Sequence, residues 1–237
     1  MQATELDPAL SQTLEDAQNG GLKLVIGNKN YSSWSMRAWV AMRAFNIPFQ
    51  EIRILLDRAD TSRQIVHYSP AGRVPILLAA DTVVWDSLAI CEYLAEQFPE
   101  KNMWPQDVAA RAEARAICAE MHCGFTGVRS AMWMNIKARF PGKGRTVDAQ
   151  ADIGRISEIW ENCLSQSGPD DFLFGDFSIA DAYFAPVAMR FRTYDVVLGP
   201  ALDAYVERVA AHPAVAQWIN GALAETEAIA KYDVYPD

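Results

Sequence analysis

Hydroxyl side chains gather near the predicted start of a helix, in the run Tyr31-Ser32-Ser33-Trp34-Ser35. The free backbone N–H groups and the positive dipole end of a helix N-terminus favour an anion. Serine hydroxyls at such a place either cap the helix or hold an anion such as a thiolate. Because hydrogen bonding to the charged form of a thiol lowers its pKa, this run would suit activation of a sulfur nucleophile. Simple helix capping is the alternative.

Two further motifs have the groups needed to bind a peptide-like ligand. Arg73-Val74-Pro75 opens a predicted strand, where proline is unfavourable because it cannot donate a ladder hydrogen bond. A cis Val74–Pro75 bond would place it at a tight turn and expose the backbone N–H and C=O of Val74. Asp86-Ser87 precedes a predicted helix, with Ser87 as a candidate N-cap, and could hold the ammonium and carboxylate of one amino-acid head group. A trans proline in an edge strand and plain capping are the alternatives.

The elements that would position these motifs follow from the spacing of apolar residues. Apolar alternation and short apolar runs predict strands at residues 22–27, 48–56, 74–80 and 82–85. Helical spacing predicts helices at residues 35–45, 61–68 and 87–98. The resulting order is β-α-β-α-β-β-α, and each motif lies near one end of a predicted strand.

The second half of the chain shows helical periodicity alone. A polar stretch with two prolines at residues 99–105 is predicted to be a linker. Helices are predicted at residues 106–139, 147–167, 178–193, 200–211 and 213–230. We therefore expect a flexible leader over residues 1–21, an α/β domain over 22–98 and an all-α bundle over 106–237.

Composition excludes several function classes. The chain has 237 residues and a net charge of −9, which opposes binding to a phosphate backbone. No stretch approaches the roughly 20 apolar residues of a membrane span, and the acidic N-terminus lacks the features of a signal peptide. We therefore expect a cytoplasmic protein with no nucleic-acid or membrane partner. The cysteines show neither a CxxC motif nor metal-ligand spacing, so no metal site is expected: Cys91, Cys118, Cys123 and Cys163.

Together, the element order, Val74-Pro75, the run DSLAICEYL at residues 86–94 and the all-α second domain resemble the cytosolic glutathione transferases. The resemblance covers nearly all of the chain from residue 22. SIADAYFAPV at residues 178–187 is similar to the buried capping box of that family, with Ser178 at the N-cap and Asp181 at N3. HPAVAQWI at residues 212–219 is similar to its final core helix. The resemblance implies a thioredoxin-like first domain that binds glutathione, and a homodimer.

The resemblance also implies roles for the two ligand-binding motifs. Val74, before a cis Pro75, would pair its backbone with the cysteinyl unit of glutathione. Ser87 would hold the γ-glutamyl carboxylate, and Asp86 would lie near the ammonium group. Arg73 occupies a position that often touches the same ligand. The glycine carboxylate has no clear partner, and Arg73 and His67 are the only suggestions.

The hydroxyl run resembles the Ser-Ser-Cys-Ser-x-Arg run of the zeta class. By that match Ser32 is the activating hydroxyl, Ser33 is the second choice, and Tyr31 is a distant third because another branch of the family uses tyrosine. Trp34 stands where the zeta run has cysteine, and its bulk should shape the electrophile pocket. This departure puts the maleylacetoacetate isomerase activity of that class in doubt.

The second-substrate pocket is expected to be apolar and to lie between the domains. One stripe of the helix predicted at residues 106–139 is apolar and includes Met121 and Phe125. The neighbouring stripe includes His122 and Trp133. These four residues, together with Trp34, are the predicted pocket lining. The alternative for the apolar stripe is that it belongs to the core.

The functional prediction is a serine-type glutathione transferase that conjugates glutathione to a small apolar electrophile. One alternative keeps the fold and changes the reaction to a zeta-like, glutathione-dependent cis-trans isomerisation. A second alternative is a non-catalytic transferase-like binding module. Ser32, Val74-Pro75 and Asp86-Ser87 are present together, which argues against a module that has lost glutathione chemistry.

Overall fold

The computed structural model describes residues 21–168 and 170–235, so the predicted leader lies outside the described residues except for Gly21. A four-stranded sheet has the order β2-β1-β3-β4. Its strands are β1 (Leu22–Ile26), β2 (Phe49–Arg53), β3 (Ile76–Ala79) and β4 (Thr82–Val84). β1 and β2 pair in parallel, and the other two pairings are antiparallel. The observed order of elements, β-α-β-α-β-β-α, is the predicted one. Together with the mixed sheet, it confirms a thioredoxin-like first domain.

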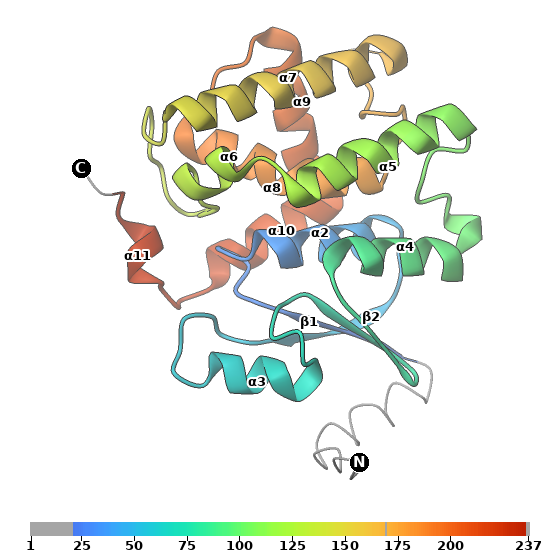
Figure 1. Cartoon of the computed structure of the whole chain (residues 1–237), viewed down its shortest axis with the longest axis vertical. Helices are drawn as coiled ribbons and strands as arrows, with labels where there is room; N and C mark the ends of the chain where they lie inside the picture. Colours follow the sequence, from blue (N-terminus) through green and yellow to red (C-terminus); the bar gives the residue numbers. More distant parts are fainter. Residues whose placement is uncertain (1–20, 169, 236–237) are drawn as a thin grey trace.

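Helices cover both faces of this sheet (Figure 1). α2 (Ser33–Ala44) and α4 (Ser87–Gln97) lie on one face, and α3 (Thr61–Tyr68) lies on the other. Alternation along β1 explains the two layers, because Leu24 belongs to the main core whereas Val25 packs in a separate cluster with Ile65 of α3. Cover on both faces is typical of sheets that contain parallel strand pairs such as β1 and β2.

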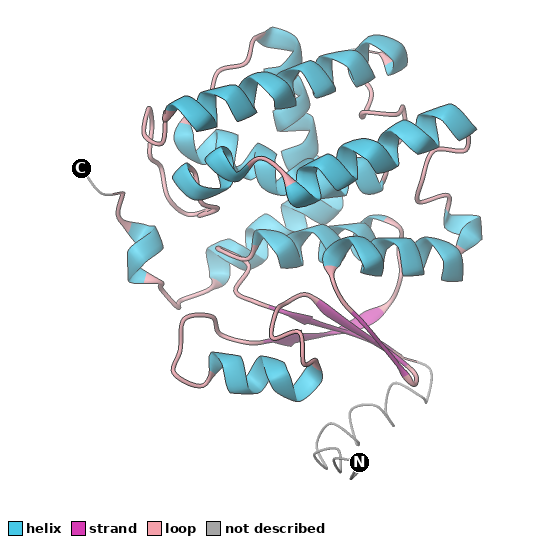
Figure 2. Ribbon diagram, viewed as in Figure 1, coloured by secondary structure: helices cyan, strands magenta, loops and turns pink. Residues whose placement is uncertain are grey.

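The rest of the described chain consists of helices joined by loops (Figure 2), with isolated bridges in the loop before α8. A short 3₁₀ turn, η1 (Pro99–Lys101), lies in the stretch predicted as a linker. It is followed by α5 (Val108–Cys123), α6 (Thr126–Ala131), α7 (Val147–Ser167), α8 (Ile179–Tyr194), α9 (Pro200–Ala211), α10 (Pro213–Ala224) and α11 (Ala230–Asp233).

Two helix predictions are corrected by the structure. The single helix predicted at residues 106–139 ends at Cys123, and Phe125 adopts a left-handed conformation with φ 55° before α6 begins. The chain therefore turns there, and it is irregular again after Ala131. The helix predicted at residues 213–230 ends at Ala224, because the Glu225 carboxylate accepts hydrogen bonds from the backbone N–H groups of Lys29 and Asn30.

The two halves share one continuous core. α2 packs against the sheet on one side and against α8 on the other. Arg37 of α2 is buried and donates from Nε to the backbone oxygen of Tyr183 in α8, at 3.1 Å. The buried rings of Trp39 in α2 and Trp218 in α10 also pack across this boundary, with 5.3 Å between their centroids.

The predicted capping box starts the central helix of this core. Ser178 is the N-cap of α8, and its side chain accepts from the N–H of Ala180 at 3.2 Å. The fully buried Asp181 carboxylate accepts from the Ser178 N–H at 2.9 Å. The same carboxylate accepts from the Leu173 N–H and the Tyr205 hydroxyl, each at 3.0 Å. The box therefore fixes the loop before α8 and contacts α9.

Candidate active site

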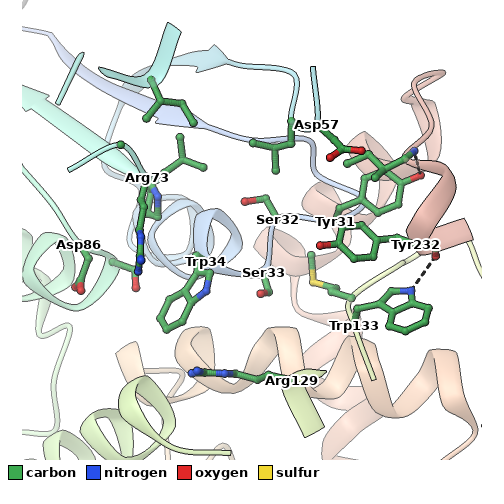
Figure 3. Close-up of a pocket in the computed structure, with 18 of the residues that line it drawn as sticks. Tyr31, Ser32, Ser33, Trp34, Asp57, Arg73, Asp86, Arg129, Trp133 and Tyr232 are labelled. Atoms are coloured by element: carbon green, nitrogen blue, oxygen red, sulfur yellow. Dashed lines mark hydrogen bonds between the residues drawn. The ribbon is translucent and has the colours of Figure 1, made fainter. Parts of the chain in front are cut away.

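A cavity of about 810 Å³ lies where the sheet domain meets the helices (Figure 3). The starts of α2 and α4, the loop before β3 and the segment around α11 all contribute to its wall. Most of the residues singled out in the sequence line it: Ser32, Ser33, Trp34, Arg73, Val74, Pro75, Asp86, Ser87, His122 and Trp133. The cavity therefore collects the three motifs in one place.

The two serines at the start of α2 use their hydroxyls differently. Ser32 is the N-cap residue, yet its side chain makes no capping hydrogen bond. Its Oγ instead donates to Ser35 Oγ at 2.7 Å, and Ser35 Oγ also accepts from the Gly27 N–H. Ser33 Oγ accepts from Nη2 of Arg190 at 3.1 Å. Figure 3 shows the two serines flanked by aromatic rings, Trp34 on one side and Tyr31 and Trp133 on the other.

Three arginines surround this end of the cavity. Arg190 is 4% exposed, and its burial, reinforced by the nearby Arg37 and Arg129 charges, lowers its pKa to about 9. The guanidinium carbon of Arg37 lies 4.2 Å from the centroid of the Trp34 ring, and that of Arg129 lies 5.3 Å from it. Within residues 21–168 and 170–235, none of the three arginines forms an ion pair with a carboxylate.

The loop before β3 and the start of α4 form the opposite wall. The Val74–Pro75 bond is cis, as the sequence suggested, and the Trp85–Asp86 bond is also cis. Asp86, not Ser87, is the N-cap of α4, because its Oδ1 accepts from the Leu88 N–H at 3.1 Å. Ser87 is therefore the first helical residue, and its hydroxyl is not used as the cap.

A chain of polar contacts links this wall to the helical domain. Asp86 Oδ2 lies 3.0 Å from His122 Nε2, and His122 Nδ1 lies 2.7 Å from the Tyr183 hydroxyl. The Tyr183 hydroxyl lies 3.0 Å from Ser87 Oγ. The N-cap and the first residue of α4 are thus joined through α5 to α8, and both of them line the cavity.

The segment around α11 closes a further side of the cavity. The Tyr31 hydroxyl donates to Asp233 Oδ1 at 2.6 Å and accepts from the Ile229 N–H at 3.2 Å. Trp133 Nε1 donates to the Tyr232 backbone oxygen at 2.8 Å. These contacts join the segment to the residue before the N-cap of α2 and to the chain that follows α6.

Comparison with known proteins identifies the architecture. The N-terminal domain model of glutathione S-transferase matches residues 31–97, and the C-terminal domain model matches residues 108–221. The chain belongs to the glutathione S-transferase family. Both halves of that family's fold are therefore present, in the family's order.

Several relatives of the chain are isomerases by name. The chain is 25% identical over 169 residues to a probable maleylacetoacetate isomerase of Caenorhabditis elegans, covering 71% of this chain and 78% of the relative. It is 25% identical over 204 residues to maleylacetoacetate isomerase of Pseudomonas aeruginosa, covering 83% and 94%. A glutathione transferase homolog from Burkholderia gl BGR1, solved with bound glutathione, superposes with a TM-score of 0.67 at 24% identity, covering 86% of this chain and 100% of the other.

Two of the predicted pocket residues of this glutathione S-transferase family member lie elsewhere. Met121 and Phe125 are buried in the core, 0% and 6% exposed, and do not line the cavity. His122 lines the cavity from the end of α5 and Trp133 lines it from the segment after α6, whereas Met121 and Phe125 pack into the core. The core alternative therefore describes Met121 and Phe125.

Sequence reasoning missed several other lining residues. Arg190 is one, and the available signal was a charged residue within the apolar pattern of α8. Lys231 and Tyr232 are two more. A last helix continuing to residue 230 gave no reason to expect the chain to turn after Ala224 and bring these two residues to the cavity. Among the residues that the structure describes, no cluster of three metal-ligating side chains occurs, and no helix has the length and apolar character that crossing a membrane requires.

Replacing Tyr31 with phenylalanine is expected to change catalysis by no more than about 3-fold, because its hydroxyl already serves Asp233 and Ile229. Burial, followed by the hydrogen bond to Asp233, raises the pKa of Tyr31, and because its single hydroxyl hydrogen is donated to Asp233 it is not free for a thiolate. The free energy of unfolding should fall by about 1 kcal/mol. Steady-state kinetics and urea titration measure both effects, and a 100-fold loss of kcat in a folded variant would make Tyr31 the activating hydroxyl.

Proposed function

We propose that this protein binds glutathione in the cavity and stabilises its thiolate with a serine hydroxyl at the start of α2. The observation that carries the proposal is the convergence of three elements on one cavity: the serine-bearing start of α2, the cis-proline loop before β3, and the start of α4. A helix N-terminus with adjacent hydroxyls suits an anion, and a cis-proline loop offers backbone groups to a peptide.

Glutathione would lie along the wall formed by the loop before β3 and the start of α4. Val74 would pair its backbone with the cysteinyl unit, Ser87 would hold the γ-glutamyl carboxylate, and Asp86 would lie near the ammonium. The Burkholderia relative with bound glutathione supports a glutathione site in a chain of this fold. For the glycine carboxylate, Arg73 lines the cavity and His67 does not.

The energy required for thiol activation is modest. Lowering the pKa of a thiol from about 8.5 by about 2 requires roughly 2.7 kcal/mol. A hydrogen bond to a charged group contributes about 1.5–3 kcal/mol, and a helix N-terminus adds about 0.3–1 kcal/mol. The thiolate then attacks an electrophilic carbon: a C–S bond forms and the leaving group departs with its electron pair.

A second candidate function is isomerisation, and the arginines favour it. Arg129 and Arg190 line the cavity, and guanidinium groups suit a carboxylate-bearing substrate better than a purely apolar one. In this reaction the thiolate adds to a double bond, rotation follows, and the thiolate is expelled. The names of the Caenorhabditis and Pseudomonas relatives point to maleylacetoacetate as the substrate to test. In either reaction we propose that the protein acts as a cytoplasmic homodimer, as the family resemblance suggests.

An ultraviolet difference titration with glutathione across pH tests the proposal, because a thiolate absorbs where a thiol does not. We expect saturable binding and an apparent thiol pKa well below that of free glutathione. Binding without a thiolate signal would favour a carrier. No binding would favour the non-catalytic module. Turnover of maleylacetoacetate without conjugation of neutral electrophiles would favour the isomerase.

Replacing Ser87 with alanine is expected to raise the glutathione Kd about 10-fold or more, because a hydrogen bond to the γ-glutamyl carboxylate is lost. Ser157→Ala is the matched control, since that hydroxyl bonds to the Ile153 backbone oxygen on α7, away from the cavity. Calorimetric titration measures both constants. An unchanged Kd in the Ser87 variant would contradict the placement of the ligand.

A further inference from the structure

A buried arginine stands directly behind one of the two candidate serines. Arg190 of α8 donates from Nη2 to Ser33 Oγ at 3.1 Å. Its Nε donates to the Met132 backbone oxygen at 2.8 Å, and its Nη1 donates to the Pro186 backbone oxygen at 3.4 Å. Three nitrogens of the guanidinium are therefore held in place, and the residue still reaches the cavity wall.

This contact decides where the hydrogen of the Ser33 hydroxyl can point. A hydroxyl has one hydrogen to donate, and its lone pairs accept. Because the Ser33 oxygen accepts from Arg190, its own hydrogen is left for another partner, and no acceptor for it occurs among the described residues. Ser32 differs, since its hydrogen is already donated to Ser35. A sulfur atom in the cavity would find a free donor at Ser33 and a committed one at Ser32.

The charge of Arg190 is uncompensated in the described structure. Its contacts are to two backbone oxygens and a hydroxyl, and Arg37 and Arg129 are close enough to repel it. A buried cation without a counter-charge is costly, and a nearby anion removes part of that cost. A glutathione thiolate beside Ser33 would carry one negative charge into this cationic corner.

We propose that Arg190 is a positioning residue that directs the Ser33 hydroxyl hydrogen at the glutathione sulfur and stabilises the thiolate through its charge. The inference rests on the proposed glutathione binding and names Ser33, in place of the first choice Ser32, as the donor. Formation of the thiolate transfers the thiol proton to solvent, and no other bond changes. The reacting group is positioned by two elements from opposite halves of the chain, α2 and α8.

The test is the pKa of the bound thiol in Arg190→Gln, read from thiolate absorption across pH. We expect this pKa to rise by about 1 or more, because both the charge and the held geometry are lost. S-methylglutathione, which has no thiol, should bind within about 3-fold of the unmodified protein because the ligand wall is unchanged. Arg192→Gln is the matched control: it removes the same charge from the same helix, but its side chain is exposed and paired with Glu207.

A second pair of variants keeps the test decisive if Arg190→Gln does not fold. Arg190→Lys retains a charge, but lysine cannot make all three contacts of the guanidinium. We expect Arg190→Lys to change the thiol pKa less in a protein that already carries Ser33→Ala than in one that keeps Ser33. Equal effects of Arg190→Lys with and without Ser33 would overturn the positioning role. A lowered thiol pKa in the unmodified protein that neither Arg190 variant changes would overturn the inference while leaving the proposed function intact. Failure of the unmodified protein to bind glutathione would overturn both.

Discussion

Replacing Ser33 with alanine is expected to lower kcat about 100-fold at pH values below the pKa of free glutathione, with the glutathione Kd changed only a few-fold. The variant loses the one cavity-lining serine hydroxyl at the start of α2 whose hydrogen has no acceptor among the described residues. Loss of one preorganised donor to a developing anion typically costs about 100-fold or more in rate. The ligand wall formed by Val74 and Ser87 remains, so binding of the peptide portion is retained.

Ser32→Ala is the matched control, since it makes the same chemical change one residue away. Its expected cost is the hydrogen bond to Ser35, about 1 kcal/mol of folding free energy, with kcat within a few-fold. Steady-state kinetics with one electrophile under saturating glutathione compare the two variants. The assignment is reversed if Ser32→Ala inactivates the enzyme and Ser33→Ala does not.

The pH profile separates a lost donor from a damaged site. In the unmodified protein we expect the bound thiol to have a lowered pKa, so kcat should be level above that pKa and fall below it. In Ser33→Ala the thiol ionises at higher pH, so kcat should keep rising with pH and approach the unmodified rate near the pKa of free glutathione. A constant fractional loss at every pH would indicate disturbed geometry.

Replacing Asp181 with alanine is expected to lower the free energy of unfolding by about 4 kcal/mol, a large share of the stability of an ordinary domain. Its carboxylate is 0% exposed and accepts from Leu173 N–H, from the N–H and hydroxyl of Ser178, and from the Tyr205 hydroxyl. Alanine would leave these donors buried without an acceptor, which costs more than a surface cap. Chemical denaturation followed by tryptophan fluorescence measures the change.

Asp107→Ala provides the comparison for a simple cap. Asp107 is exposed at the start of α5, and its side chain accepts from a single N–H, that of Ala110, at 2.9 Å. We expect a loss of about 1 kcal/mol. Equal effects of the two substitutions would mean that the buried box is no more than a helix cap. Neither variant should alter the thiol pKa, because both residues lie away from the cavity.

The order of elements was predictable because local periodicity determines it. The short apolar run of β1 and the prolines Pro48 and Pro99, which interrupt the pattern, set the elements of the first domain in sequence. The break between α5 and α6 was not predictable from periodicity, because the apolar spacing continues through Gly124 and Phe125. A left-handed residue in an otherwise helical pattern leaves no periodic trace.

The candidate site was predictable where it is local in sequence. The serine run, Val74-Pro75 and Asp86-Ser87 each form within a few residues, and all line the cavity. Arg190 could not be placed, because its partner Ser33 lies 157 positions away. The end of α10 depends on Lys29, which lies 196 positions from Glu225. Such contacts arise only when the two halves of the chain pack together.

The placement of α2 constrains how this protein can be recombined with its relatives. α2 presents the serines to the cavity, covers the sheet, and meets α8 through Arg37 and Tyr183. A chimera that joins the first half of this chain to the second half of a relative would keep the loop before β3 and the start of α4, where glutathione is proposed to bind. It would, however, replace the α8 residues against which the buried side chains of α2 pack. Recombination within the family should therefore give folded proteins when α2 and α8 come from the same parent. A crossover in the loop before α5 separates these two helices, so we expect it to destabilise the chimera.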